Sequence, residues 1–214
     1  QVTIIAFFYY YSMKIVVPEN ISDITLGQFQ KFLLIEKGSN LTDYQLNTEK
    51  LSVFIGLTND QIEAISQTDR DDLISLIDKA LGETTEFKHT FKMGGQSFGF
   101  HPNLDKITTG EYVDLMNYNS EPENLHKLMS ILFRPIVSSD VVGNYKIAKY
   151  NGSSEYAETM KDTPLNIVNG ALVFFLSLSR ELKKAIQKFS QGLELAKEEK
   201  RQTTGTTGGG TLPL

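Results

Sequence analysis

Residues 103–115 read Asn-Leu-Asp-Lys-Ile-Thr-Thr-Gly-Glu-Tyr-Val-Asp-Leu, and a degraded copy of this stretch stands near the start of the chain. The copy covers residues 20–32, which read Asn-Ile-Ser-Asp-Ile-Thr-Leu-Gly-Gln-Phe-Gln-Lys-Phe. Both follow the pattern apolar-x-x-Ile-Thr-x-Gly-(Gln/Glu)-aromatic-x-x-apolar, and both have Asn one residue before the first apolar position. Ile24 and Ile107 hold the same place in the pattern, so the copies are offset by 83 residues. We interpret the chain as an ancient tandem repeat.

Each copy carries the signals of a helix start. Thr25 stands three residues before Gln28, and Thr108 stands three residues before Glu111. At this spacing the Thr hydroxyl can accept from the third helical N–H, while the amide or acid accepts from the Thr N–H, which is a capping box. An apolar residue before each Thr and an aromatic residue after it complete a hydrophobic staple; the pairs are Ile24 with Phe29 and Ile107 with Tyr112. Because these residues are used in starting helices, we interpret the motif as structural rather than as a binding loop.

Composition sets limits on the class of protein. With 214 residues, 40% hydrophobic and 10% aromatic, the chain is long enough for a core and ordinary for one or two globular domains. A net charge of −5 and a pI of about 5.3 give no basic surface for nucleic acid, so direct nucleic-acid binding is not expected. The absence of Cys excludes disulfides, thiol catalysis and Cys-type zinc sites, and it fits a chain that folds in a reducing cytoplasm.

The first residues, 1–12, are apolar and read Gln-Val-Thr-Ile-Ile-Ala-Phe-Phe-Tyr-Tyr-Tyr-Ser. They lack the initiating Met, basic region and cleavage site of a signal peptide, and they are too short to span a bilayer. We take Met13 as the natural start and expect residues 1–12 to be a non-native or upstream leader. The alternative, which their β-branched and aromatic content supports, is a real β-strand.

The N-terminal repeat half is expected over residues 13–82. It begins with a short strand, Lys14–Val17, and continues with the capped helix to about Lys37. Apolar residues at helical spacing then predict further helices over about 41–57, from Thr58, and over about 69–81.

The C-terminal repeat half is expected over residues 83–201. It opens with two alternating runs around Gly94-Gly95, the signal for a tight β-hairpin in which Phe91 faces Phe98. The residues expected on its buried face are Phe87, His89, Phe91, Phe98 and Phe100. Next, Ser120-Glu121-Pro122-Glu123 predicts a third capping box, before a helix whose core stripe runs through Phe133 up to Arg134-Pro135.

Residues 136–163 are the least regular part, with 145–150 read as a strand. Thr163-Pro164 is then predicted to cap the longest helix, whose apolar stripe is Leu165, Val168, Leu172, Phe175, Leu176, Leu182, Ile186, Phe189 and Leu193. Its densest apolar run, residues 165–178, is interrupted by polar residues and suits a core helix better than a membrane span. The Gly/Thr-rich end, residues 202–214, is expected to be a flexible tail. The predicted fold class is α+β, mostly helical, with two strand-turn-helix repeat units, a β-hairpin and a long C-terminal helix.

No constellation of catalytic residues is found in the sequence. His89 and His101 are expected on opposite faces of the hairpin, and His126 on a separate helix, which predicts no metal site. The glycine pairs lack the spacing and the Lys of a phosphate-binding loop. Among the nearby carboxylates Glu111 is engaged by its cap, while Asp105 and Asp114 are read as turn and solvent-face residues. We therefore predict no enzyme, no catalytic or metal residue and no cofactor.

Three stretches nevertheless resemble a group of tailed-bacteriophage proteins of the tail assembly chaperone type. They are Phe-Gly-Phe-His-Pro-Asn-Leu-Asp-Lys-Ile-Thr-Thr-Gly-Glu-Tyr-Val-Asp-Leu at 98–115, Asn-Leu-His-Lys-Leu-Met-Ser-Ile-Leu-Phe-Arg-Pro-Ile at 124–136 and Pro-Leu-Asn-Ile-Val-Asn-Gly-Ala-Leu-Val-Phe-Phe at 164–175. The resemblance covers roughly residues 14–190, in structural rather than catalytic motifs.

The resemblance implies a small, acidic, mostly helical protein that lies in the host cytoplasm during infection. Such a protein would bind the tape measure protein or tail tube subunits before the tail forms, with no membrane or nucleic-acid partner and with self-association into a homo-oligomer left open. The alternative is a virion structural component, such as a head–tail connector or a packaged protein, located in the virion. A third reading is an enzyme whose site the sequence does not display.

Overall fold

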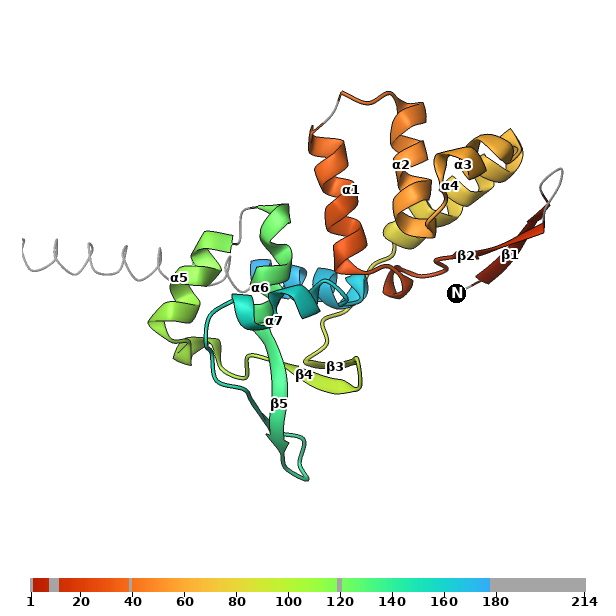
Figure 1. The fold of residues 1–214 in the computed structure, drawn as a ribbon. Coiled ribbons are helices and arrows are strands. Elements are labelled where there is room, and N and C mark those ends of the chain that lie inside the picture. Colours follow the sequence, from red (N-terminus) through yellow and green to blue (C-terminus); the bar gives the residue numbers. More distant parts are fainter. Residues whose placement is uncertain (1, 8–11, 39, 119–120, 178–214) are drawn as a thin grey trace, which may run out of the picture. The chain divides into compact units, whose positions relative to one another are not determined.

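The computed structural model describes residues 2–7, 12–38, 40–118 and 121–177 (Figure 1). The chain divides into two compact units, residues 1–171 and 172–214, and the elements below belong to the first unit unless stated. The predicted boundaries at residues 82/83 and 201/202 stay predictions, as does the non-native origin of residues 1–12. Within residues 1–12 the structure has a strand at Val2–Phe7, which is the alternative that the sequence left open.

The first half is a β-hairpin followed by helices. Strands β1 (Val2–Phe7) and β2 (Ser12–Val17) pair in antiparallel fashion, with Val2 opposite Val17. The elements that follow are a 3-10 turn η1 (Ile21–Asp23), α1 (Leu26–Gly38), α2 (Asp43–Ile55), α3 (Asn59–Ala64) and α4 (Gln67–Leu81). The helices predicted from apolar spacing are thus confirmed.

The second half contains a four-stranded antiparallel sheet of order β3-β4-β5-β6. Its elements are β3 (Thr90–Met93), β4 (Gln96–Phe100), η2 (Leu104–Lys106), α5 (Thr109–Tyr118), η3 (Pro122–Asn124), α6 (Leu125–Leu132), β5 (Phe133–Ser139), β6 (Tyr145–Ile147) and α7 (Ser154–Met160). A last helix covers 165–177 among the described residues and continues into the second unit. The predicted α+β, mostly helical class is confirmed. The predicted stripe from Leu182 to Leu193 and the tail 202–214 lie outside the described residues.

The internal repeat is visible in the element boundaries. Strands β2 and β4 end at Val17 and Phe100, and helices α1 and α5 begin at Leu26 and Thr109, each pair 83 residues apart. The 3-10 turns η1 and η2 keep the same offset. Because both Thr residues of the motif lie directly before a helix, the prediction of two strand-turn-helix units is confirmed.

The predicted capping boxes form in both copies. Thr25 N–H donates to Gln28 Oε1 at 3.0 Å, and Gln28 N–H donates to Thr25 Oγ1 at 3.2 Å. The corresponding distances at Thr108 and Glu111 are 2.6 and 3.2 Å. Further capping boxes form at Thr42 and Gln45 before α2, which was not predicted, and at Thr58 and Gln61 before α3.

The β3–β4 hairpin turns at Gly94-Gly95 as predicted, with Phe91 opposite Phe98. The two turn glycines have φ of 56° and 78°, a left-handed conformation that favours residues without Cβ. Phe98 and Phe100 are fully buried and Phe91 is half-buried, in contact with Phe133 of β5. The expectation of a buried His89 is wrong, since its side chain is exposed at the sheet edge.

The largest error of the sequence reading concerns residues 133–139. The helix α6 ends at Leu132, and β5 begins at Phe133, so Phe133 and Arg134 lie in a strand and not in a helical stripe. Pro135 lacks a backbone N–H, but its carbonyl accepts from Ala148 N–H at 2.8 Å, and the pairing of β5 with β6 is irregular directly after it, between Ile136 and Ser138. Helix α7, inside the stretch that we expected to be irregular, was also missed.

The helix caps predicted at Thr163 and at Ser120 are not found as predicted among the described residues. The Thr163 hydroxyl, which was predicted to cap the last helix, instead donates to Met160 Sδ at 3.4 Å. Backbone hydrogen bonds join this segment to the first repeat unit: Leu26 N–H donates to Thr163 O at 2.9 Å, and Leu165 N–H donates to Ile24 O at 2.8 Å. Ser120 lies outside the described residues, and the helix after it begins only at Leu125, following the turn η3. No helix in the described ranges is long and apolar enough to cross a membrane.

Candidate functional site

Helix α5, which begins at the second copy of the repeated motif, presents two chemically different faces. One face carries Glu111 and Leu115, which are buried. The other carries Tyr112, Val113 and Met116, which are exposed.

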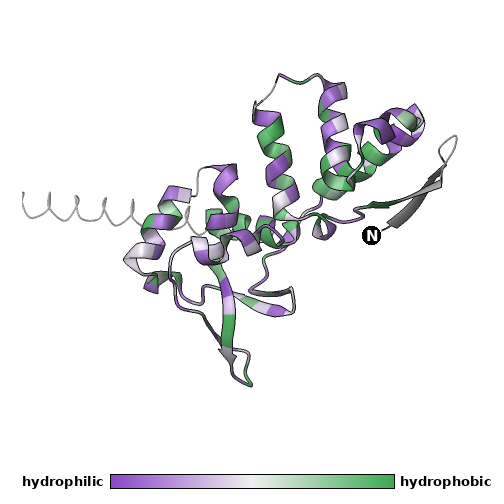
Figure 2. Cartoon of the chain, viewed as in Figure 1, coloured by the Kyte–Doolittle hydropathy of each residue, from purple (hydrophilic) through white to green (hydrophobic). Residues whose placement is uncertain are grey.

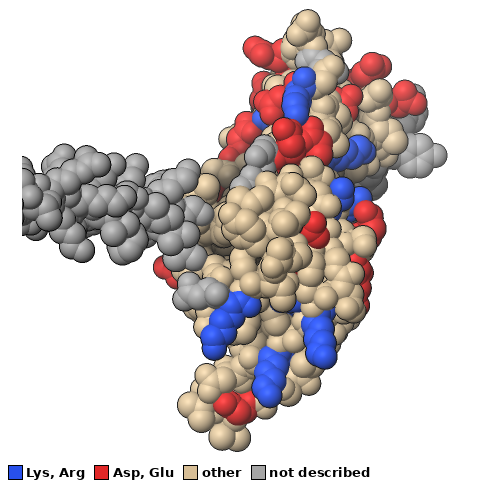
Figure 3. Space-filling view, turned by 90° about the vertical axis from the view of Figure 1, so that its left-hand side faces the viewer, with Lys and Arg blue, Asp and Glu red and all other residues tan. Residues whose placement is uncertain are grey.

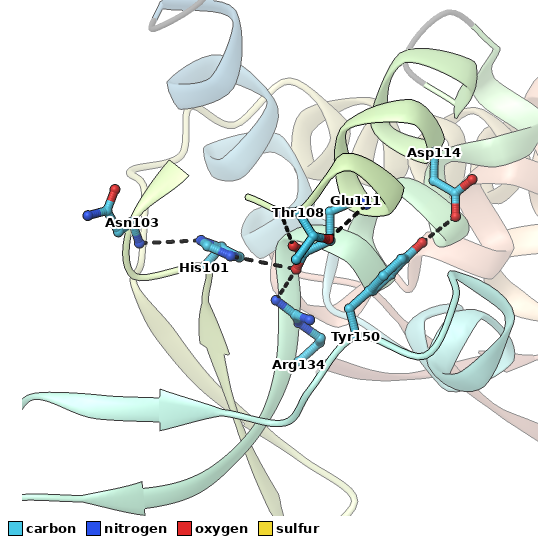
Figure 4. Close-up of polar contacts among 7 residues, drawn as sticks. All are labelled: His101, Asn103, Thr108, Glu111, Asp114, Arg134 and Tyr150. Carbon is cyan, nitrogen blue, oxygen red and sulfur yellow. Dashed lines mark hydrogen bonds and ion pairs between the residues drawn. The ribbon is translucent and has the colours of Figure 1, made fainter. Parts of the chain in front are cut away.

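Glu111 is a buried carboxylate whose two oxygens have separate partners (Figure 4). Oε2 accepts the Thr108 N–H at 2.6 Å, and Oε1 accepts from Arg134 Nη2 at 2.5 Å. Glu111 is 2% exposed and Arg134 is 4% exposed, so both charged groups are shielded from solvent. A buried ion pair of this kind is stable only because each charge keeps its partner.

His101, the residue after β4, completes the cluster on the side away from the helix. Its Nε2 lies 3.6 Å from Glu111 Oε1, and its Nδ1 accepts the Asn103 N–H at 3.3 Å. An Nδ1 that accepts a hydrogen bond carries no proton, so the ring proton is on Nε2 and points towards Glu111. Burial lowers the pKa of His101, with the Arg134 charge acting in the same direction against the pull of Glu111. The imidazole is therefore neutral at pH 7.

Opposing effects act on the Glu111 carboxyl. Burial by itself raises its pKa, but the hydrogen bonds from Thr108 and the charge of Arg134 outweigh burial, and the pKa of Glu111 is held below its ordinary value. The carboxylate is thus ionised at pH 7, and it is not set up to donate a proton.

Tyr150, in the segment after β6, lies beside Arg134 on the side of the cluster away from His101 (Figure 4). Its hydroxyl donates to an Asp114 carboxylate oxygen, and the Arg134 guanidinium carbon lies 5.5 Å from the centre of its ring. Burial, followed by the neighbouring Asp114, raises the pKa of Tyr150. The Tyr150 hydroxyl therefore stays protonated, and its hydrogen bond joins Asp114 of α5 to the segment that follows β6.

The contacts of the cluster indicate a structural role rather than a catalytic or metal-binding one. Both Glu111 oxygens are engaged, and within the described ranges no group of three or more His, Cys, Asp or Glu residues could hold a metal ion. In the cluster, the buried Arg134 Nε has no hydrogen-bond partner among the described residues. The cluster holds α5 against β4, β5 and the Tyr150 loop.

The histidines and carboxylates that the sequence analysis considered do not form one cluster in the structure. His101 and Glu111 come together, and Asp114 pairs with Tyr150, which corrects the reading of Asp114 as a solvent-face residue. His126 is buried elsewhere, with its Nδ1 3.1 Å from Gln30 Nε2. The side chain of Asp105 lies outside the described residues.

Arg134 and Tyr150 were missed by the sequence reading. A signal for Arg134 was present: the repeat replaces the neutral Gln28 by Glu111 at a position facing the interior, and a buried carboxylate requires a cation.

The exposed face of α5 is the strongest candidate for binding another molecule. Tyr112, Val113 and Met116 are 52%, 48% and 43% exposed, and their spacing places them on adjoining parts of the helix surface. Aromatic residues and Met are enriched at protein–protein interfaces, where they fill partner pockets. The polar cluster fixes the orientation in which this face is presented.

Comparison of the chain with protein-family models, with curated proteins and with solved structures finds no match. The function is therefore argued from the chain's own residues and from the resemblance described above.

Proposed function

We propose that the protein acts by binding other proteins, as a tail assembly chaperone of a tailed bacteriophage, and not as an enzyme. Its partners would be the tape measure protein or the tail tube subunits, bound in the host cytoplasm before the tail forms. The proposal joins the resemblance of the three sequence stretches to the arrangement of α5.

The observation that carries it is the contrast between the two faces of α5. On the buried face, both carboxylate oxygens of Glu111 are already engaged, one by a hydrogen bond from Thr108 and the other by the ion pair with Arg134. The outward side chains are the apolar Tyr112, Val113 and Met116, which in water have no partner to bury against. A helix anchored on one side and apolar on the other supports binding of a partner protein better than catalysis.

The test is retention of tail proteins by the intact chain. Tape measure and tail tube proteins of the same phage are co-expressed with the tagged protein, and their co-purification is compared between the wild type and Tyr112→Ser/Met116→Ser. We expect the double substitution to weaken retention at least about tenfold, because hot-spot residues, among which Tyr is enriched, cost about 2 kcal/mol or more when truncated.

The matched control is Leu34→Ser, which removes a 48%-exposed apolar side chain from the outer face of α1. This variant should retain the partner as the wild type does. Failure of the wild-type protein to retain either tail protein would contradict the proposal, as would equal losses in the control and the α5 variant.

A structural role in the virion is the alternative, and it predicts a different distribution of the protein. A chaperone is absent from purified particles, whereas a head–tail connector or packaged protein is present at fixed stoichiometry. Mass spectrometry of purified virions separates the two.

A further inference from the structure

The β5–β6 hairpin carries an exposed apolar apex that neither the Glu111 cluster nor the α5 face uses. Val141 and Val142 stand at its turn with relative exposures of 104% and 82%, and Val137 is exposed on the strand that leads to it. Figure 2 shows the hydrophobic colouring at this end of the hairpin. Two fully exposed β-branched side chains side by side are unusual for a surface that only meets water.

The apex has a defined conformation. The Asp140 carboxylate accepts the Val142 N–H at 3.0 Å, the Asn144 N–H at 2.8 Å and the Asn144 side-chain amide at 2.8 Å. Gly143 follows with a φ of 92°, which a residue with Cβ adopts only under strain. The turn therefore holds both valines outward instead of letting them fold back.

The hairpin is fixed to the rest of the sheet by Tyr145, the first residue of β6 after the turn. Its hydroxyl lies 2.9 Å from the Phe100 carbonyl and 3.1 Å from the His89 carbonyl, so it can donate to either. Its ring covers Gly99, where an added Cβ would lie 2.4 Å from Tyr145 Cε2. A glycine on β4 thus makes room for the side chain that anchors the hairpin.

The hairpin is also basic on its exposed surface. Lys146 and Lys149 are exposed, Arg134 is buried with Glu111, and the one carboxylate of residues 133–150, Asp140, is occupied by its own turn. Figure 3 shows several Lys and Arg side chains close together on the lower part of the face in view. A partner surface that fits should be acidic and should offer some apolar area.

The chain itself contains such a surface on α3 and α4. Residues 59–81 carry six acidic side chains, all exposed: Asp60, Glu63, Asp69, Asp71, Asp72 and Asp78. Of these, Asp78 pairs with Lys50 at 2.7 Å, and Asp69 accepts from the Ser66 hydroxyl at 2.7 Å. The same stretch has two basic residues, of which Arg70 is buried and donates to the Tyr44 carbonyl at 2.9 Å. On α4 the positions Asp69, Asp72 and Leu76 follow at spacings of three and four, so they share one face, and Leu76 is 36% exposed.

We propose that the β5–β6 hairpin of one copy docks on the Asp69–Asp72–Leu76 face of α4 in a second copy. The valines meet the apolar side chain, and Lys146 and Lys149 meet the carboxylates. The two surfaces are different parts of the chain, so the contact is head-to-tail and leads to rings or open chains of subunits rather than to a closed dimer. This self-association does not depend on the tail-protein partners proposed above.

The first test is the sedimentation velocity of the full chain, alone, over a range of protein concentrations at low and high salt. We expect species larger than a dimer that grow with concentration and shrink with salt, because the charges at the rim of the contact are screened. Val141→Ser/Val142→Ser should raise the dissociation constant by at least about tenfold. The control Val173→Ser, another exposed valine, should leave it unchanged.

A charge exchange tests the pairing of surfaces. Lys146→Glu/Lys149→Glu alone and Asp69→Lys/Asp72→Lys alone should each remain monomeric, since each places like charges in the contact. A mixture of the two variants restores opposite charges in both contacts of an alternating chain, and it should assemble again. The control Lys31→Glu, an exposed charge on α1, should assemble as the wild type does.

A monomeric wild-type protein at every concentration overturns the proposal, as does assembly that the valine substitutions leave unchanged. Failure of the mixture to assemble, when each variant alone is folded by circular dichroism, overturns the assignment of α4 as the receiving surface. If the hairpin variants instead lose retention of tail proteins while the chain is always monomeric, the hairpin binds a different protein and self-association is rejected.

Discussion

The two repeat units begin their helices in the same way but attach them to the rest of the protein by different chemistry. In the first unit Gln28 accepts from Thr25 with its oxygen and donates its Nε2 to the Val53 carbonyl of α2 at 3.2 Å. In the second unit Glu111 accepts from Thr108 with one oxygen and from Arg134 of β5 with the other. A neutral amide joins helix to helix, and a buried ion pair joins helix to sheet.

This difference shows which part of the motif is fixed by helix initiation and which part is free to change. The oxygen that faces the Thr N–H is required for the cap, and both Gln and Glu supply it. The second polar atom of the same side chain decides what the helix is tied to. The second unit therefore contains a buried charge pair that becomes costly if one member is lost, whereas the first unit does not.

The largest loss of stability is expected when Glu111 of the second unit is replaced by Gln, the residue at the same place in the first unit. Glu111→Gln keeps the cap but leaves the Arg134 guanidinium buried without a countercharge, which costs about 3–5 kcal/mol of unfolding free energy. Chemical denaturation followed by circular dichroism measures the change.

The matched control is the double variant Glu111→Gln/Arg134→Met, which removes the buried charge together with its partner. It should recover most of the stability that the single substitution loses. If Glu111→Gln is as stable as the wild type, the ion pair does not hold α5 in place.

A smaller effect is expected from acid. The pKa of Glu111 in the folded protein lies below its ordinary value of 4.5, so the unfolded chain binds a proton first as the pH falls. The stability from this group is full above about pH 4.5 and is lost as the pH falls through the folded pKa.

His101 acts in the same direction at higher pH, because its folded pKa lies below its ordinary value of 6.5 and protonation favours the unfolded chain. The unfolding free energy of the wild type should therefore fall in both windows. In Glu111→Gln/Arg134→Met the fall below about pH 4.5 should be shallower. Parallel curves for the two proteins would show that Glu111 carries no such contribution.

The caps themselves should have similar strengths in both units. Thr25→Ala and Thr108→Ala each remove a hydroxyl that accepts a helical N–H at 3.2 Å, and each should cost about 0.5–2 kcal/mol. The two values are compared in the same denaturant titration, with Thr25→Ser and Thr108→Ser as controls that keep the hydroxyl. A loss at one position without a loss at the other would mean that the repeated motif is not used equally.

The sequence predicted best where local chemistry decides the structure. The caps at Thr25 and Thr108 and the turn at Gly94-Gly95 depend on residues within a few positions of each other, and all three form as expected. The strand at 133–139 could not be predicted in this way, because Phe133 continues the apolar helical pattern of α6, and only pairing with β4 makes Phe133 and Arg134 extended. The partnership of Glu111 with Arg134 depends on that same pairing, so the polar cluster was missed with the strand.

The smallest effects should distinguish the glycines that follow the two caps, Gly27 and Gly110. Neither has a positive φ, so each could accept a Cβ as far as the backbone is concerned, and Ala in a helix lowers the entropy lost on folding by about 0.4–1 kcal/mol. At Gly110 the nearest atom to an added Cβ is a Tyr150 ring carbon at 3.9 Å, which is ordinary contact.

At Gly27 the Lys161 carbonyl oxygen would lie 3.2 Å from the new Cβ, and the same carbonyl accepts the Gly27 N–H at 2.7 Å. Movement of that carbonyl would weaken the hydrogen bond that joins α1 to the segment before Thr163. Gly110→Ala should therefore raise the unfolding free energy by a few tenths of a kcal/mol up to about 1 kcal/mol, and Gly27→Ala should raise it less or lower it. Equal gains at both positions would show that the contact at Lys161 yields without cost, and that the two helix starts differ only in the partner of their third residue.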